Sequence, residues 1–198
     1  KLYESTKPKQ HPIGMTGLHE GGEPISNISL YNSPADWISP NNSDPYMNDP
    51  PSAHESKIII SDTDHLWGIG GNYSWVWKSF LRGLNPIFMD PWEPIPATAD
   101  PKNDPNFHEW TLLRRAMGDT LRFAQRMGLS AMVPRGELAS SSYCLANPDR
   151  EYLVYLPSDG HFGVNWFDRF HLHGGVNWFS KAMGGSQTVS VDLSVSSK

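Results

Sequence analysis

Apolar and polar positions alternate in blocks along the chain, and the clearest block is the isoleucine run at 58–60, followed by the polar sequence SDTDH. Three successive apolar residues leave no polar face, so a strand over 57–61 is expected to be covered on both faces, as in a parallel sheet. A helix is predicted over 73–81, with Asn72 or Ser74 as its cap and Gly83 at its end. Strand, loop and helix in this order form the repeating unit of an α/β protein.

Similar segments precede and follow this unit. Residues 11–16 are expected to form a second short buried strand, and residues 86–90 form another short apolar segment. Residues 24–56 have little regular period and are expected to form a long loop of the kind that covers binding sites. A long helix is predicted over 106–127, because apolar residues recur there at helical spacing.

The pattern changes after residue 129, where short segments of β type follow one another without intervening helices. The predicted strands are 130–133, 142–146, 151–156 and 187–193. The last two alternate between apolar and polar residues, which indicates an antiparallel sheet with one solvated face. The predicted fold class is therefore α/β, with an α/β part over 1–129 and an antiparallel β part over 130–198.

An aromatic insert at 159–185 interrupts the β part, and in it the sequence GVNWF occurs twice, at 163–167 and 175–179. Two copies are too few for a solenoid, so the insert is a candidate for paired loops or for self-association. His171 and His173 would share one face of a strand, which is one way to place two imidazoles on a metal ion. Because such a pair is common, neither a metal nor another cofactor is expected.

Composition narrows the range of partners. The 198 residues carry a net charge of -5, and no basic cluster with interleaved aromatic residues occurs, which argues against a nucleic-acid partner. No apolar run approaches the length of a membrane span. Cys144 is the single cysteine, so no internal disulfide can form. Aromatic residues make up 12% of the chain, and those beside carboxylates suit a carbohydrate-binding cleft, although most tryptophans are core residues.

Ionisable side chains follow both predicted strands of the α/β part. Asp62, Asp64 and His65 come directly after the isoleucine strand. His19 and Glu20 follow the earlier strand in the same way. In α/β enzymes the chemistry lies at the carboxyl ends of the strands, so these residues are candidates for a site. The alternative is that the two aspartates cap loop amides and that Glu20 belongs to a solvated loop.

Aromatic side chains add further candidates for binding a ligand. Asp36 and Trp37 lie in the long loop over 24–56 and would line a cleft. Trp67 follows His65 closely and is a candidate platform on which a sugar ring stacks.

Several runs of the sequence resemble one bacterial family. They are KPKQHPIGMT, YNSPADWISPN, ISDTDHLWGIGGNYSWVWKSFLRGLNPIFMDPW, RRAMGDTLRFAQRMGL and SSYCLANPDREYLVYLP. They resemble the C-terminal part of glycoside hydrolases with a (β/α)8 barrel that are related to apiosidase-like catalytic domains. In that family a C-terminal β domain follows, labelled as the collagen-binding domain of a collagenase. The resemblance covers most of residues 1–157 and the tail from Gln187, whereas residues 159–185 depart from the family pattern.

The resemblance implies a catalytic barrel. Residues 11–16 would be barrel strand seven, residues 57–61 would be strand eight, and the loop over 24–56 would cover the catalytic mouth. That mouth would hold four of the candidates, Asp62, Asp64, His65 and Trp67. A complete barrel needs about 250 residues. Because only two strand–helix units are predicted before the β part, the chain would be a fragment without activity of its own.

The resemblance also implies two catalytic carboxylates, one on each side of the scissile glycosidic bond. In related barrels the acid commonly comes from strand four and its partner from strand seven. Glu20 is the nearest match to the partner position, and the acid would lie upstream of Lys1. Asp62 and Asp64 are the other catalytic-site candidates, which would bind substrate or tune its charge. The resemblance further implies a secreted or periplasmic protein.

Three functions stay open from the sequence. The first is a fragment of a glycoside hydrolase that acts on a plant or bacterial polysaccharide. The second is a module that binds a glycan or a collagen-like polymer without catalysis. The third is an assembly protein whose aromatic insert forms subunit contacts. A protease is not supported, because the sequence has no HExxH motif and Cys144 lies in an apolar strand typical of a core.

Overall fold

The computed structural model describes most of the chain, namely residues 4–17, 26–41, 44–53, 56–67, 70–90, 105–148, 150–157, 176–182 and 185–191. The chain divides into two compact units. The first unit comprises Lys1–Ser79 and Leu84–Met117, and the second comprises Phe80–Gly83 and Gly118–Lys198.

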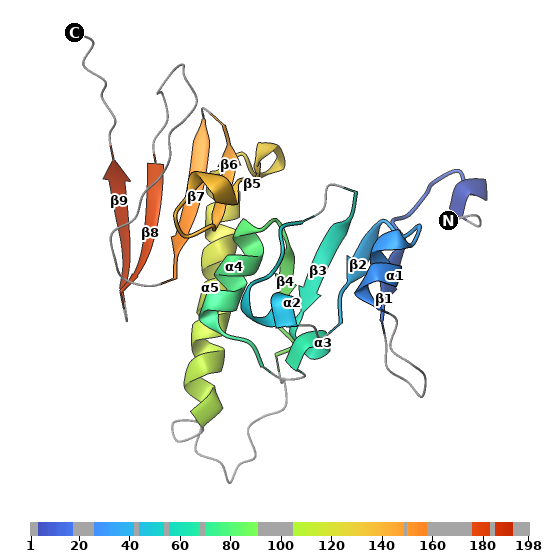
Figure 1. The fold of residues 1–198 in the computed structure, drawn as a ribbon, viewed down its shortest axis with the longest axis horizontal. Coiled ribbons are helices and arrows are strands. Elements are labelled where there is room, and N and C mark those ends of the chain that lie inside the picture. The colour runs from blue at the N-terminus through green and yellow to red at the C-terminus, as the bar shows by residue number, and fades with distance from the viewer. Residues whose placement is uncertain are drawn as a thin grey trace. The chain divides into compact units, whose positions relative to one another are not determined.

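The first unit is built on a four-stranded parallel sheet (Figure 1). Its strands are β1 (Gly14–Thr16), β2 (Trp37–Ser39), β3 (Ile58–Asp62) and β4 (Asn85–Ile87). The spatial order is β1-β2-β3-β4, so each strand pairs with the next strand in the chain. Right-handed connections between such successive neighbours all run over the same face of a sheet.

Three of the described helices lie within this unit, and two longer ones each continue into the second unit. They are α1 (Asn27–Asn32), α2 (Asp44–Asn48), α3 (Thr63–Trp67), α4 (Tyr73–Leu81) and α5 (Pro105–Arg126), and a 3-10 turn at Glu4–Thr6 precedes β1. At the start of α4, the side-chain oxygen of Asn72 accepts a hydrogen bond from the Trp75 amide (2.9 Å). After α4 the chain turns at Gly83, whose φ of 77° is accessible mainly to glycine. The predicted helices at 73–81 and 106–127 are confirmed.

The two faces of β3 differ in their burial. Ile59 is 0% exposed, and its register partner Ile38 of β2 is equally buried. Ile58 is 56% exposed, although it is the same residue type in the same strand. Side chains alternate along a strand, so Asp62 lies on the same face as Ile58. Ile87 of β4 pairs with Asp62 and therefore also lies on this face, where it is 40% exposed. The expectation that both faces of β3 are covered is therefore wrong for the face that carries Ile58.

The segment over 24–56 is not the irregular loop expected from the sequence, because it contains α1, β2 and α2. These elements have only 6, 3 and 5 residues, which is shorter than the window over which a helical period can be counted. In the sheet, β2 lies between β1 and β3. The assignment of residues 11–16 and 57–61 to the neighbouring barrel strands seven and eight is therefore wrong.

The second unit contains a small antiparallel sheet. Its strands are β5 (Val133–Pro134), β6 (Cys144–Asn147) and β7 (Glu151–Leu156), and they pair in that order. The antiparallel arrangement predicted from the sequence is confirmed for these three strands. Residues Leu129–Ala131 form a 3-10 turn instead of the start of a strand, and a second such turn at Gly136–Leu138 precedes β6.

Two further strands extend this sheet. β8 (Val176–Ala182) pairs with β7, and β9 (Gly185–Val191) pairs with β8 in an antiparallel hairpin. The pairing of β7 with β8 is parallel, which differs from the antiparallel arrangement expected throughout this part. β8 lies within the aromatic insert. Most of the insert and all of its side chains lie outside the described residues, so the predicted self-association stays a prediction.

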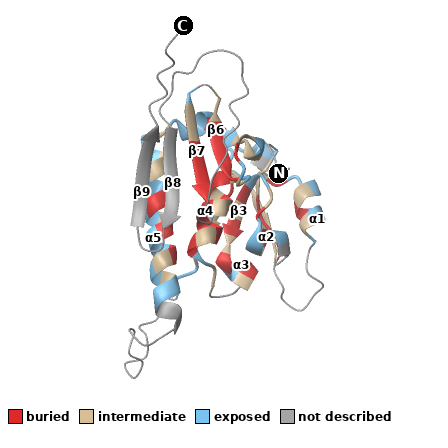
Figure 2. Cartoon of the chain, turned by 60° about the vertical axis from the view of Figure 1, so that its left-hand side comes forward, coloured by how far each residue is buried: buried red, intermediate tan, exposed pale blue. Residues whose placement is uncertain are grey.

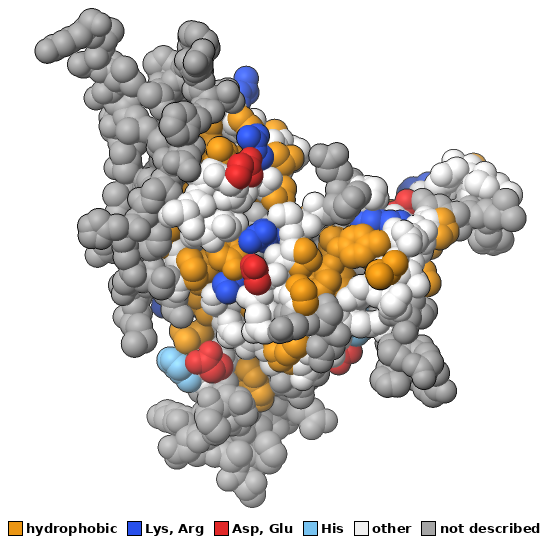
Figure 3. All heavy atoms as spheres, in the orientation of Figure 1, with side chains coloured by type: hydrophobic (Ala, Val, Ile, Leu, Met, Phe, Trp, Pro, Cys, Tyr) orange, Lys and Arg blue, Asp and Glu red, His pale blue; other side chains and the backbone are white. Residues whose placement is uncertain are grey.

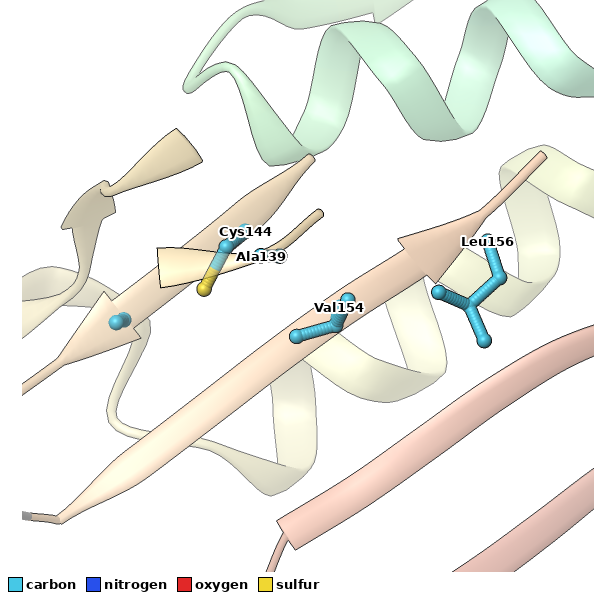
Figure 4. Packing of buried hydrophobic residues seen from close by; sticks show 5 residues of the cluster. Ala139, Cys144, Val154 and Leu156 are labelled. Atoms are coloured by element: carbon cyan, nitrogen blue, oxygen red, sulfur yellow. The ribbon is translucent and has the colours of Figure 1, made fainter. Parts of the chain in front are cut away.

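The apolar core of the second unit lies on β6 and β7, whose residues are mostly buried (Figure 2). Figure 4 shows Cys144 of β6 beside Val154 of β7, its register partner. The core cluster comprises Ala139, Cys144, Ala146, Val154 and Leu156. Burial raises the pKa of the Cys144 thiol to about 12, so the thiol is protonated at neutral pH. Cys144 is therefore a core residue and not a nucleophile.

Candidate functional site

Polar side chains lie at the carboxyl ends of three neighbouring strands. Thr16 is the last residue of β1, Ser39 is the last of β2, and Asp62 is the last of β3. Because the strands are parallel and adjacent, these ends meet along one edge of the sheet. This carboxyl edge is the candidate site, and the helix α3 begins directly at it.

His65 connects α3 to two of these strand ends. Its Nδ1 atom lies 2.8 Å from Ser39 Oγ, and its Nε2 atom lies 3.4 Å from Thr16 Oγ1. A neutral imidazole has one donor and one acceptor nitrogen, and a hydroxyl can take either role, so both contacts are satisfied in either tautomer. Ser39 is only 3% exposed, which makes the loss of its hydrogen bond costly.

The two aspartates at the carboxyl edge have different environments. Asp62 Oδ1 accepts a hydrogen bond from the Asp64 amide (2.9 Å), so Asp62 caps the N-terminus of α3. Asp64 is exposed, and within the described ranges its carboxylate forms no hydrogen bond or ion pair. The capping alternative from the sequence therefore applies to Asp62, whereas the Asp64 carboxylate has no partner among the described residues.

Asp90, which follows β4 in the chain, forms an ion pair. Arg114 of α5 donates from Nε and Nη2 to the two carboxylate oxygens of Asp90, at 2.6 and 2.5 Å. This guanidinium holds the pKa of the Asp90 carboxyl below its usual value. The same segment is tied to the start of α3, because the Met89 amide donates to Thr63 Oγ1 (2.9 Å). Asp90 is therefore part of the scaffold beside the edge.

Trp67 stands at the end of α3, half-buried, with its position set by two glycines. Its ring meets the buried ring of Trp75 edge-on, with centroids 5.2 Å apart. A Cβ added to Gly70 would lie 2.7 Å from the Cβ of Trp67, and one at Gly71 would crowd Leu113 and Thr63. Gly71 also has a φ of 92°. Gly70 and Gly71 thus allow the chain to pass close to the Trp67 side chain.

The sequence pattern missed several polar residues of this edge. A Cβ on Gly17 would lie 2.0 Å from the Asn41 side chain, so Asn41 fits against the exit of β1 only because glycine is there. Asn27 binds Asn41 through two hydrogen bonds, accepting from its amide (2.9 Å) and donating to its carbonyl (3.4 Å). Thr16 and Ser39 were not candidates either, because a single hydroxyl at the end of a short strand has no distinctive spacing.

Asp36 and Trp37 lie at the other end of β2. Asp36 Oδ2 accepts a hydrogen bond from the Ile13 amide (2.9 Å), and the Asp36 amide donates to the Ile13 carbonyl (2.7 Å). The indole of Trp37 occupies the space over Gly14, where an added Cβ would lie 1.9 Å from it. Both residues join the amino end of β2 to β1, so they do not form a loop over the carboxyl edge as the resemblance implied.

Other sequence candidates lie outside the described residues. They include His19 and Glu20, which follow β1 in the chain, and His171 and His173 of the aromatic insert. Within the described ranges, no group of three or more histidine, cysteine, aspartate and glutamate side chains is placed to hold a metal ion. The members of the predicted set that lie at the carboxyl edge are Asp62, Asp64, His65 and Trp67, and all four belong to one segment of the chain.

The surface in Figure 3 carries basic and acidic side chains side by side, and the described residues form no continuous basic area on the face shown. A phosphate backbone is bound through such an area, so this face lacks the usual feature of a nucleic-acid interface. None of the helices in the described ranges is both long and apolar enough to cross a membrane.

Comparison with known proteins gives no match: no family model, no curated protein and no solved structure matches this chain.

Proposed function

We propose that this chain is a carbohydrate-active part of a glycoside hydrolase and that the carboxyl edge is where its saccharide binds. The observation that carries the proposal is that Ser39, His65 and Asp64 lie at one edge of a parallel sheet, and that the Asp64 carboxylate has no partner among the described residues. Saccharides are bound through hydroxyl groups that donate to carboxylates and through ring faces that stack on aromatic side chains. Asp64 and Trp67 supply these two kinds of group.

The fold supports a barrel as the larger architecture. In a (β/α)8 barrel each strand pairs with the next strand in the chain, the helices lie outside, and apolar side chains fill the interior. The order β1-β2-β3-β4 follows this rule. Two isoleucines on the same face of the sheet, Ile58 and Ile87, are exposed, as side chains on the inner face of half a barrel would be. Four further parallel strands would cover this face and close the barrel.

The proposed barrel changes the roles inferred from the resemblance. If the four strands are the last four of eight, β3 is the seventh strand and β1 is the fifth. The catalytic partner carboxylate of the resembled family follows strand seven, so it falls on the Asp62–Asp64 segment and not on Glu20. Hydrolysis needs a second carboxylate as the acid, on the opposite side of the scissile bond. That acid would come from strand four, which the four strands of this sheet do not include.

A second function, saccharide binding without hydrolysis, is favoured by one observation. Asp62 is engaged as a helix cap, so Asp64 is the one carboxylate at the described edge that is free of protein partners. One carboxylate suffices to bind a sugar hydroxyl, whereas hydrolysis requires two. Reducing-sugar release separates the two functions in a protein that also supplies the acid of strand four, because there both functions predict binding and only the first predicts release.

Calorimetric titration of the chain with neutral oligosaccharides tests the proposal. The panel comprises xylo-, cello-, manno- and arabino-hexaose, and the variant Asp64→Asn removes the charge at nearly constant shape. The matched control is Glu109→Gln, which removes an exposed carboxylate from α5. We expect binding of at least one saccharide, weakened about tenfold or more by Asp64→Asn and unchanged by Glu109→Gln. Absence of binding to every member, or equal binding by Asp64→Asn, would contradict the proposal.

A further inference from the structure

We infer that Asp64 is the residue of the carboxyl edge that contacts the ligand, whereas Asp62 and His65 are positioning residues that fix where its carboxylate lies. This inference rests on the proposed function and assigns its binding role to one residue. It differs from the sequence prediction, in which Asp62, Asp64 and His65 all meet the substrate.

Asp62 is fixed by its own hydrogen bond. Its Oδ1 atom accepts from the Asp64 amide, which is the second amide of α3 and has no carbonyl partner within the helix. A saccharide that used this oxygen would compete with the cap. The cap also sets the start of α3 at the end of β3, so it determines the backbone position from which the Asp64 side chain projects.

His65 is held in place by hydrogen bonds to the ends of two strands. Both of its ring nitrogens are within hydrogen-bond range of strand-end hydroxyls, Ser39 on β2 and Thr16 on β1. A ligand that used either nitrogen would have to displace one of these hydroxyls, and Ser39 is almost fully buried. Because His65 directly follows Asp64, the two contacts hold this turn of α3 against β1 and β2.

The contacts of Asp62 and His65 leave Asp64 as the residue of this segment that can contact a ligand. Its carboxylate is exposed and unpaired within the part of the chain that the structure describes. An ionised carboxylate only accepts hydrogen bonds, and its two oxygens can receive two donors at once. The ligand it fits is therefore a saccharide that offers two neighbouring hydroxyl groups as donors.

Variants of Asp62 separate a cap from a ligand contact. Asparagine caps a helix about as well as aspartate, whereas alanine does not. We expect Asp62→Asn to keep the melting temperature and to bind the best saccharide of the hexaose panel within about twofold of the unchanged chain. We expect Asp62→Ala to lower both the melting temperature and the affinity for the saccharide. Asp64→Asn should weaken binding about tenfold or more without a change in melting temperature. If Asp62→Asn weakens binding as much as Asp64→Asn does, Asp62 contacts the ligand and the inference is wrong.

Ser39→Ala tests His65 without changing the imidazole. If His65 acts by position, Ser39→Ala should weaken saccharide binding in the unchanged chain and have no further effect in the His65→Ala background. The ¹⁵N shifts of the His65 ring should move in Ser39→Ala, because Nδ1 loses its partner. Thr16→Val, which is nearly isosteric, gives the same test at Nε2. Unchanged ring shifts and additive losses of affinity would mean that His65 is not positioned by these hydroxyls.

Saccharide binding by the chain and the roles assigned to Asp62, Asp64 and His65 are contradicted by different results. If no saccharide binds, the proposed function fails and the contact role of Asp64 fails with it. The positioning roles of Asp62 and His65 are then contradicted only if the melting temperatures and the ring shifts also stay unchanged. If a saccharide binds and Asp64→Asn binds equally well, the proposal of an edge contact through Asp64 is wrong.

Discussion

Ile58 and Ile59 are neighbours of the same residue type on opposite faces of β3, and replacing each by alanine gives a sensitive test of the sheet. Ile59 is 0% exposed and Ile58 is 56% exposed. Ile59→Ala removes a fully buried side chain and leaves a cavity, so its expected cost is about 3 kcal/mol within a range of about 2–5. Ile58→Ala removes a side chain that is already more than half hydrated and leaves no closed cavity. Its expected cost is below about 1 kcal/mol, on the scale of apolar burial.

Urea unfolding of the two variants and the unchanged chain measures this difference. The loss of β propensity from isoleucine to alanine is common to both variants and lies within about 1 kcal/mol, so it cancels in the comparison. The midpoint should fall clearly for Ile59→Ala and only slightly for Ile58→Ala, at an unchanged slope. Equal losses would refute the reasoning, because they would mean that the face of Ile58 is buried in solution. If the stability lost in Ile58→Ala grows with protein concentration, another copy of the chain covers the face that carries Ile58.

Three other outcomes are expected from the described contacts. Ser61→Ala should raise the free energy of unfolding by about 1 kcal/mol, because the fully buried Ser61 hydroxyl has no hydrogen-bond partner among the described residues; a lower melting temperature would contradict this. Cys144 should resist thiol reagents at neutral pH until the second unit unfolds. The pKa of this thiol is raised from 9.0 to about 12, so the folded state keeps the proton to a higher pH than the unfolded state does. The stability contributed by this thiol should therefore be lost as the pH rises above about 9, and a stability independent of pH in that range would contradict this. Arg114→Gln should raise the pKa of Asp90 and cost less than about 1 kcal/mol, because both partners are partly exposed; an NMR titration of the Asp90 carboxyl that is unchanged would contradict the pair.

The α/β class and the central unit could be predicted from the sequence for physical reasons. The isoleucine run at 58–60 is apolar enough to mark a strand, and α4 carries a capping asparagine and a terminating glycine at their usual positions. The helix α5 spans 22 residues, so its apolar period repeats several times and is easily recognised. Segments with a repeated local pattern were therefore correctly predicted.

Short elements and long-range contacts could not be predicted in the same way. β2 has three residues, too few for an alternation to be counted, and because it was omitted, residues 11–16 and 57–61 were expected to form adjacent strands. Thr16 and Ser39 become site residues only because β1 and β2 bring them to His65, 49 and 26 positions away along the chain. Asp62 and Asp64 look alike in the sequence, and only the hydrogen bond to the Asp64 amide distinguishes Asp62, the cap, from Asp64, whose carboxylate has no partner among the described residues. The candidate segment was thus predictable, whereas the division of roles within it was not.

The most direct test of the central claim is a titration of the ¹⁵N-labelled chain with the hexaose panel, followed through its amide resonances. We expect one saccharide to shift the amide resonances of Asp64, His65 and Trp67 at the carboxyl edge. The amides of Asp36 and Lys57, at the amino ends of the same strands, should stay unchanged. Shifts confined to the amino ends or to the second unit, or no shifts with any saccharide, would contradict a carbohydrate site at the carboxyl edge.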